Sequence, residues 1–134
     1  MNTANLKRQH DDIKIIIDKI LKDMNKDIDE NSMNIAKNIN KLAGVLKIHL
    51  NSEDKYLYPN LLNHSDEIIR NKAKYYLEEM GSVSDSFSEF HKKYNIGSKI
   101  RESKNSFKTE CKDTLRVVLN RINKEDSDLY LLIK

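Results

Sequence analysis

The sequence predicts an all-α protein, an antiparallel up-down-up-down four-helix bundle. Only three glycines and one proline occur in 134 residues, so chain-breaking residues are too scarce for a turn-rich β fold. Apolar residues recur at alternating steps of three and four, which is the spacing of amphipathic helices. Polar stretches divide this pattern into four segments with short connections, as in helical bundles. The length suits one domain, and we assign residues 1–134 to it.

Each segment carries one apolar stripe. The first stripe runs over residues 6–28, where Ile28 fits less regularly, and the second over residues 35–56. The third stripe covers residues 69–94 and the fourth covers residues 111–132. Each therefore predicts one long helix with a face directed toward a shared core.

Three polar connections separate the stripes, at residues 27–32, 59–65 and 95–105. The second contains the only proline, followed by Ser65, a residue type favoured at the N-cap of a helix. The third contains Gly97 together with several serines and asparagines. Short connections of this kind predict that successive helices are antiparallel neighbours.

Composition narrows the class of protein. Lys and Arg number 24 against 21 Asp and Glu, and no basic block stands apart, so we expect no nucleic-acid partner. No apolar run approaches the roughly 20 residues of a membrane span, so we expect no membrane partner. The single cysteine, Cys111, cannot form an internal disulfide, which favours a reducing compartment and predicts a cytoplasmic location.

Polar residues interrupt the stripes at four positions: His10, His49, Glu53 and Glu125. A buried carboxylate costs several kcal/mol unless a partner compensates it. His49 and Glu53 are four residues apart, so both side chains lie on one helical face. A bound metal is the simplest partner for all four side chains, although a hydrogen-bonded core histidine at His10 and an exposed pair at 49 and 53 are the alternatives.

Antiparallel geometry brings these residues to one level of the bundle. Residues equidistant from the turn of a helical hairpin lie side by side. Counting from the expected turns places His10 level with His49 and His49 level with Glu79. Glu125 lies about one helical turn beyond the level of Glu79. Glu79 is therefore a further candidate ligand, with a solvated surface charge as its alternative.

The chain also repeats itself. Residues 49–58 resemble residues 121–130, and both contain Glu-Asp-x-x-Leu-Tyr, with Arg121 at the place of His49. A two-fold arrangement suits a binuclear centre in which two glutamates bridge and histidines cap the ends. Histidine with carboxylate suits iron, manganese or zinc, and the spacing does not choose between them.

These motifs resemble the hemerythrin-like family, also called the HHE cation-binding domain. The matching residues are Gln9 and His10; His49 to Asp54 followed by Leu57, Tyr58 and Pro59; Glu79, Met80 and Gly81; and Arg121 to Asp126 followed by Leu129 and Tyr130. The resemblance implies a non-haem di-iron site between four helices. It also implies reversible binding of dioxygen or nitric oxide, redox or iron sensing, or peroxide chemistry.

Two departures from the family pattern indicate a divergent branch. The family usually has a histidine on the third helix and His-x-x-x-Glu on the fourth. Here Glu79 best fills the first position and Arg121 replaces the fourth-helix histidine. Fewer histidines predict a harder, oxygen-rich site, closer to di-iron carboxylate oxidases. Arg121 either leaves a coordination position open or holds Glu125 or an anionic ligand.

Other residues have simpler interpretations. His91 competes with Glu79 as the third-helix ligand, but it lies three turns further along the helix and about 120° around it. His64 falls in a turn and is expected to be solvated. Four tyrosines are expected to pack in the core or at its rim, with one of them in reach of a metal-bound ligand: Tyr56, Tyr58, Tyr76 and Tyr130.

The sequence thus predicts a binuclear non-haem iron centre with five ligands. His10 and His49 are the terminal ligands, Glu53 and Glu125 bridge, and Glu79 is the further ligand. The expected small partners are dioxygen, nitric oxide or peroxide, and the sequence does not identify a protein partner. No separate catalytic acid, nucleophile or substrate pocket can be identified, so enzymatic turnover is left open. The alternatives are a regulatory or interaction module with a degraded metal site, and a di-iron oxidase or peroxidase.

Overall fold

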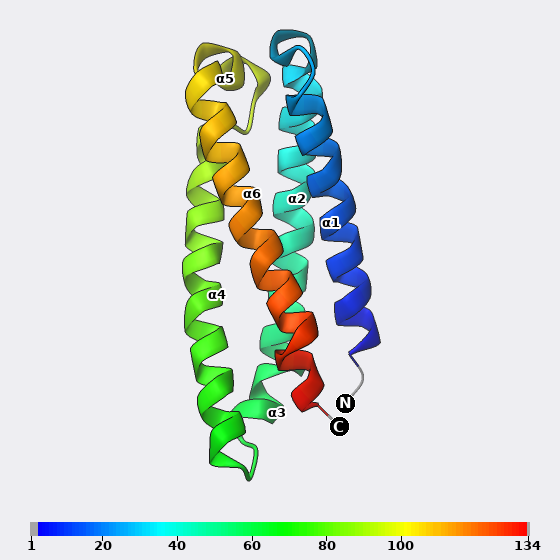
Figure 1. The fold of residues 1–134 in the computed structure, drawn as a ribbon, viewed down its shortest axis with the longest axis vertical. Coiled ribbons are helices and arrows are strands. Elements are labelled where there is room, and N and C mark those ends of the chain that lie inside the picture. The colour runs from blue at the N-terminus through cyan, green and yellow to red at the C-terminus, as the bar shows by residue number, and fades with distance from the viewer. Residues whose placement is uncertain (1–2, 134) are drawn as a thin grey trace.

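Four long helices account for most of the computed structural model, which describes residues 3–133 (Figure 1). They are α1 (Ala4–Met24), α2 (Ile28–Tyr56), α4 (Glu67–Lys93) and α6 (Lys104–Ser127). The short elements are the helices α3 (Tyr58–Leu62) and α5 (Gly97–Glu102) and the 3₁₀ helix η1 (Leu129–Leu132). No strand occurs within residues 3–133, so the all-α prediction is confirmed. Nor is any helix of that range long and apolar enough to cross a membrane.

The four long helices lie side by side along the long axis of the molecule (Figure 1). The connection between α1 and α2 lies at the same end as α5, whereas α3 lies at the other end (Figure 1). The start of α1 and the end of the described chain also lie near α3 (Figure 1). Segments far apart in the sequence therefore meet at that end, and the two halves of the internal repeat, residues 49–58 and 121–130, both finish there.

Two helix starts differ from the sequence prediction. Helix α2 begins at Ile28, inside the expected connection, because the Asp27 carboxylate accepts hydrogen bonds from the backbone N–H groups of residues 29 and 30 at 2.9 and 3.3 Å. Helix α4 is capped by Asp66 and not by Ser65. The Asp66 carboxylate accepts from the N–H of Ile68 at 2.9 Å. An aspartate at each N-cap satisfies donors that a helix leaves unpaired.

Two of the expected connections contain short helices. Pro59 lies in the first turn of α3, where a missing N–H costs nothing. Gly97 begins α5, and α6 follows after only Ser103. The fourth stripe does not continue as one helix either, because α6 ends at Ser127 and Leu129 and Leu132 belong to η1.

The buried apolar residues form two clusters along the axis. The larger one includes Ile13 on α1, Leu46 on α2 and Ile122 on α6. The smaller one gathers around α3 and η1 and comprises Leu6, Leu57, Tyr58, Leu61, Ala73, Tyr76, Leu129 and Tyr130. On three of the long helices, the interrupting polar residues fall between a residue of one cluster and a residue of the other. A polar layer formed by His10, His49, Glu53 and Glu125 therefore separates the two apolar clusters of the core.

Candidate metal centre

Four side chains of this polar layer converge although they come from three different helices. His10 on α1, His49 and Glu53 on α2 and Glu125 on α6 are at most 1% exposed. One potential ligand atom from each lies within 4.8 Å of those of the other three. The sequence prediction that these four residues meet inside the bundle therefore holds in the structure.

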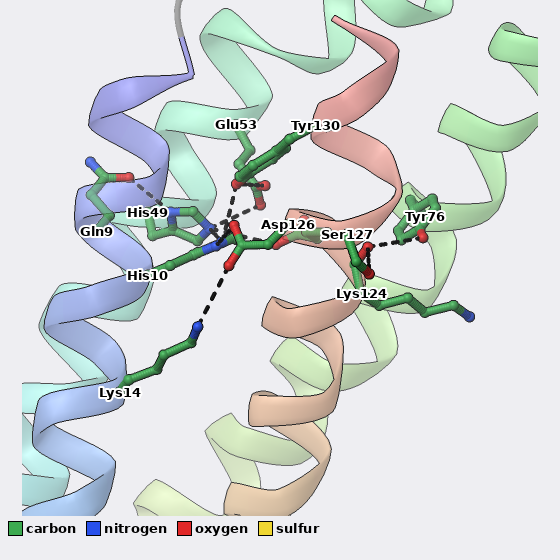
Figure 2. Close-up of polar contacts among 11 residues, drawn as sticks. Gln9, His10, Lys14, His49, Glu53, Tyr76, Lys124, Asp126, Ser127 and Tyr130 are labelled. Atoms are coloured by element: carbon green, nitrogen blue, oxygen red, sulfur yellow. Dashed lines mark hydrogen bonds and ion pairs between the residues drawn. The ribbon is translucent and has the colours of Figure 1, made fainter.

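The two imidazole rings meet through their Nε2 atoms, which are 2.9 Å apart (Figure 2). Glu125 Oε1 lies 3.1 Å from Nε2 of His10 and 3.7 Å from Nε2 of His49. Glu53 Oε1 lies 3.4 Å from Nε2 of His49. Two nitrogens and two carboxylate oxygens thus face one small volume.

Hydrogen bonds on the outer side of His49 fix its tautomer. Nδ1 of His49 lies 2.8 Å from Gln9 Oε1, and Nε2 of Gln9 donates to Ser52 Oγ at 3.2 Å. The Ser52 hydroxyl in turn donates to the carbonyl of Ile48 at 2.9 Å. Because that hydroxyl proton is already used, Gln9 must present its NH₂ to Ser52 and its oxygen to His49. The ring therefore carries its proton on Nδ1, and its Nε2 presents a lone pair.

His10 is fixed in the same way by a carboxylate. Its Nδ1 lies 2.8 Å from Asp126 Oδ1, and Lys14 pairs with the other Asp126 oxygen at 3.6 Å (Figure 2). Nδ1 of His10 is therefore a donor, and Nε2 points inward among acceptors from His49, Glu125 and Tyr130. Only a proton or a metal ion on Nε2 satisfies that arrangement. A proton on His10 Nε2 can be donated to only one of these acceptors, such as His49 Nε2, whereas a metal ion binds both nitrogens and the nearby carboxylate together. Metal-binding histidines are held by outer partners of this kind.

The two carboxylates carry opposite pKa shifts. Burial and the nearby charge of Glu125 raise the pKa of Glu53 well above its usual range. Burial also acts to raise the pKa of Glu125, but the hydrogen bond from His10 and the other polar groups of the cluster outweigh it and lower the pKa to about 2. Burial lowers the pKa of His49. One glutamate therefore keeps a proton and the other is ionised when no cation is present.

Each of the two carboxyl groups has one oxygen without a hydrogen-bond partner. Oε1 of Glu53 and Oε2 of Glu125 are buried and have no hydrogen-bond partner within residues 3–133. Unpaired buried oxygens are costly, and such groups commonly mark an ion or water site. Together with the two imidazoles they form a donor set suited to iron, manganese or zinc.

Tyr130 belongs to the site and was only partly anticipated. Its hydroxyl donates to Glu53 Oε2 at 2.8 Å and lies 3.1 Å from His10 Nε2. Its ring stacks on His10 with centroids 5.1 Å apart. Burial raises the pKa of this hydroxyl, so it remains a donor at neutral pH. The repeated Glu-Asp-x-x-Leu-Tyr motif was the available signal, because Tyr58 and Tyr130 occupy equivalent places in it.

Glu79 does not lie in the group of four. It forms an ion pair with Arg121, whose guanidinium also lies over the ring of Tyr76, with 5.1 Å between the guanidinium carbon and the ring centroid. Arg121 is 7% exposed, whereas Glu79 is 37% exposed. Burial acts to raise the pKa of Glu79, but hydrogen bonds from Tyr75 and Arg121 outweigh it and lower the pKa. Its role as a metal ligand therefore stays a prediction.

The two remaining histidines lie apart from the site. His91 Nε2 pairs with Asn40 Oδ1 at 2.7 Å, and its ring stacks on Phe87. His64 Nδ1 accepts from the backbone N–H of Asp66 at 3.0 Å. Neither ring joins the four converging side chains.

A surface pocket of about 1240 Å³ opens beside the centre and is lined in part by Gln9 and Ser52, the residues that orient His49. The four converging side chains do not line it. The pocket therefore does not expose the four converging side chains, which are at most 1% exposed.

The fold and the site together define a helical protein with a buried histidine–carboxylate cluster placed to bind metal. The family of the hemerythrin HHE cation-binding domain matches residues 1–133, and the chain belongs to that family. Comparison with curated proteins and with solved structures gave no match.

Proposed function

We propose that this protein is a non-haem iron protein of hemerythrin-like type that binds or senses dioxygen, nitric oxide or peroxide. Its metal site comprises His10, His49, Glu53 and Glu125. The observation that carries the proposal is the pair of Nε2 atoms 2.9 Å apart, both turned inward by partners on their Nδ1 atoms. Two imidazole nitrogens that face each other at this distance need a proton or a metal ion between them, and a metal ion also takes the nearby carboxylate oxygens as ligands.

The protein residues prepare the site in three ways. Gln9 and Asp126 hold the imidazole tautomers, so no proton must leave Nε2 of His49 when a metal arrives. Tyr130 holds Glu53 Oε2 and leaves Oε1 free for a metal. Burial excludes bulk water from the donors. When iron is bound, it supplies a redox-active position that takes up a small ligand.

The wider setting follows the sequence prediction. We propose one domain over residues 1–134 with up-down-up-down antiparallel topology. We also propose a cytoplasmic location and no nucleic-acid or membrane partner. Manganese and zinc are the alternative metals, because the same donors accept them.

A regulatory or interaction module is the second candidate function. The observation that favours it is the ion pair between Arg121 and Glu79, which neutralises one carboxylate of the layer without any metal. An oxidase or peroxidase is the third, favoured by the excess of carboxylate over imidazole among the sequence-predicted ligands. Multiple turnovers of oxygen or peroxide by the iron-loaded protein identify the third.

Metal analysis tests the proposal. The full chain is purified, stripped with a chelator and loaded with iron(II) under argon, and bound iron is counted per chain. We expect tight binding in the wild type and none in His49→Ala or Glu53→Ala. His91→Ala is the matched control, because it removes an imidazole outside the site, and it should bind as the wild type does.

A visible spectrum recorded under argon, air and nitric oxide then identifies the ligand. A spectral change with nitric oxide or air in the loaded wild type supports small-ligand binding. Wild-type protein that binds no iron, and whose thermal stability is unchanged by added iron, overturns the proposal in favour of the module.

A further inference from the structure

We propose that this centre takes one metal ion, on the side of α1 and α2, and that the guanidinium of Arg121 fills the place of a second ion. The inference rests on the proposed metal binding and changes its stoichiometry. The family resemblance implies two irons, and the sequence predicted that His10 and His49 cap opposite ends of such a pair. The geometry of the chain points to a different arrangement.

The distances describe ligands of one ion. Donor nitrogens and oxygens bind such metals at about 2.0–2.2 Å, so neighbouring donors on one ion lie about 3 Å apart and opposite donors about 4.4 Å apart. The two Nε2 atoms are 2.9 Å apart, and all four donors lie within 4.8 Å of one another. Two metal ions in one centre are about 3.5–4 Å apart, so terminal ligands of different ions would be more widely separated. His10 and His49 therefore serve the same ion.

The internal repeat locates the second position. His49 precedes Glu53 by four residues on α2, and Arg121 precedes Glu125 by four residues on α6. Helical geometry places the Arg121 side chain beside Glu125 as the His49 side chain lies beside Glu53. His49 of the first pair meets His10 of α1, whereas Arg121 of the second pair meets Glu79 of α4. Glu125 of the second pair also reaches His10. Arg121 thus stands where the repeat expects an imidazole.

Arginine cannot take the role of that imidazole. Its guanidinium remains protonated and offers donors only, so it has no lone pair for a metal. Here it is 7% exposed, paired with Glu79 and packed over Tyr76.

Charge balance agrees with one ion. Glu53, Glu125 and Glu79 supply three negative charges when all are ionised. One divalent cation and one guanidinium supply three positive charges. A second divalent cation would leave two uncompensated charges in a layer enclosed by apolar clusters, which is costly. The guanidinium therefore supplies positive charge in place of a second metal ion, but it cannot bind ligands or change its oxidation state.

Iron counting on the wild type and on Arg121→His tests the inference. We expect one iron per chain in the wild type and two in Arg121→His, because histidine restores a lone pair beside Glu125 and releases Glu79. Arg116→His is the matched control: it introduces the same residue on the same helix at an exposed position, and it should bind one. Circular dichroism establishes that each variant is folded.

The outcomes separate the two proposals. Two irons in the wild type overturn the single-ion inference and leave the proposed function intact, whereas none overturns the proposed function. A folded Arg121→His that still binds one iron shows that Arg121 does not fill the second position. Electron paramagnetic resonance of the oxidised wild type gives a readout without any variant. A single ferric ion gives a half-integer-spin signal that accounts for all bound iron, whereas an antiferromagnetically coupled pair gives none.

Discussion

The buried carboxylates face α1 on one side and α4 on the other, and the two sides differ in how a positive charge is supplied to them. On the α1 side, His10 and His49 turn lone pairs inward, and nothing within residues 3–133 supplies a fixed cation to them. On the α4 side, Arg121 brings a permanent charge to Glu79, and Lys124 lies over the ring of Tyr76 at 5.8 Å. The first side needs a proton or a metal ion between its imidazoles, whereas the second already holds a permanent positive charge.

The difference comes from one residue of a repeated motif. Both halves keep Glu-Asp-x-x-Leu-Tyr, and both tyrosines are buried. Tyr130 donates to Glu53, while the Tyr58 hydroxyl has no partner within the described residues. The tyrosine of the arginine half thus reaches across to the glutamate of the histidine half, whereas the tyrosine of the histidine half has no such partner. The hydrogen bonds around the two buried carboxylates are therefore as unequal as the residues at positions 49 and 121.

Metal should stabilise the protein through the α1 side alone, and this is the largest effect we expect. Free iron(II) at 100 times its dissociation constant should raise the free energy of unfolding by about 2.7 kcal/mol. Thermal or denaturant unfolding with and without iron under argon measures the gain. His49→Ala should abolish the gain and Arg121→Ala should keep it. A gain that disappears in both variants would contradict the asymmetry.

The two tyrosines offer a matched pair of substitutions for the next effect. Tyr130→Phe removes the donor to Glu53 Oε2 and leaves a buried carboxylate oxygen unpaired, so metal affinity should fall between about tenfold and a hundredfold. Tyr58→Phe removes a hydroxyl that has no partner within residues 3–133. It should leave metal affinity nearly unchanged and stabilise the metal-free protein slightly. Competition with a chromophoric chelator measures both affinities, and equal losses would refute the comparison.

The outer partner of His49 gives a smaller effect. Gln9→Leu removes the acceptor of the Nδ1 proton, so the proton can move to Nε2 and block the lone pair that binds metal. Metal affinity should fall about tenfold. Gln9→Glu is the control, because its carboxylate still accepts from Nδ1, and affinity should then stay near that of the wild type. The same chelator competition measures both variants, and a loss in Gln9→Glu as large as that in Gln9→Leu would show that the tautomer is not what matters.

Regular helical geometry explains which parts of this site the sequence could predict. Helical rise and antiparallel turns placed His10 level with His49, because both depend only on counting residues along straight helices. The stripe positions of Glu53 and Glu125 predicted burial for the same reason. These four residues come together in the structure as the sequence indicated.

The remaining features depend on helix ends, side-chain conformations and hydrogen-bond partners, which helical periodicity does not predict. Tyr130 reaches Glu53 because α6 ends at Ser127 and the chain turns into η1, although the apolar stripe continues through the break. Whether Glu79 pairs with Arg121 or turns inward depends on side-chain conformations and not on spacing. The tautomer of His49 depends on Gln9 and Ser52, two polar residues that no stripe singles out.

The smallest effect tests whether the α4 side is held by its own charges. Asp128 accepts from Lys72 Nζ at 2.8 Å and from the Tyr76 hydroxyl at 2.7 Å, and these bonds lower its pKa. Because both Lys72 and Asp128 are 37% exposed, solvent screens the pair, and Asp128→Asn should cost the metal-free protein only about 0.5 kcal/mol at neutral pH.

The stability lost in Asp128→Asn should depend on pH because the pKa of Asp128 is lowered in the folded protein. A carboxyl whose pKa is lowered in the folded state contributes its full stability above the unfolded value, near 3.9, and loses it as the pH falls through the folded value. The difference between wild type and Asp128→Asn should therefore be constant from neutral pH to about pH 5 and shrink in stronger acid. Denaturant unfolding across this range measures it. A difference that grows in acid would mean that charge pairs do not hold this side, while iron binding in Asp128→Asn should match the wild type because the pair lies outside the four metal-binding side chains.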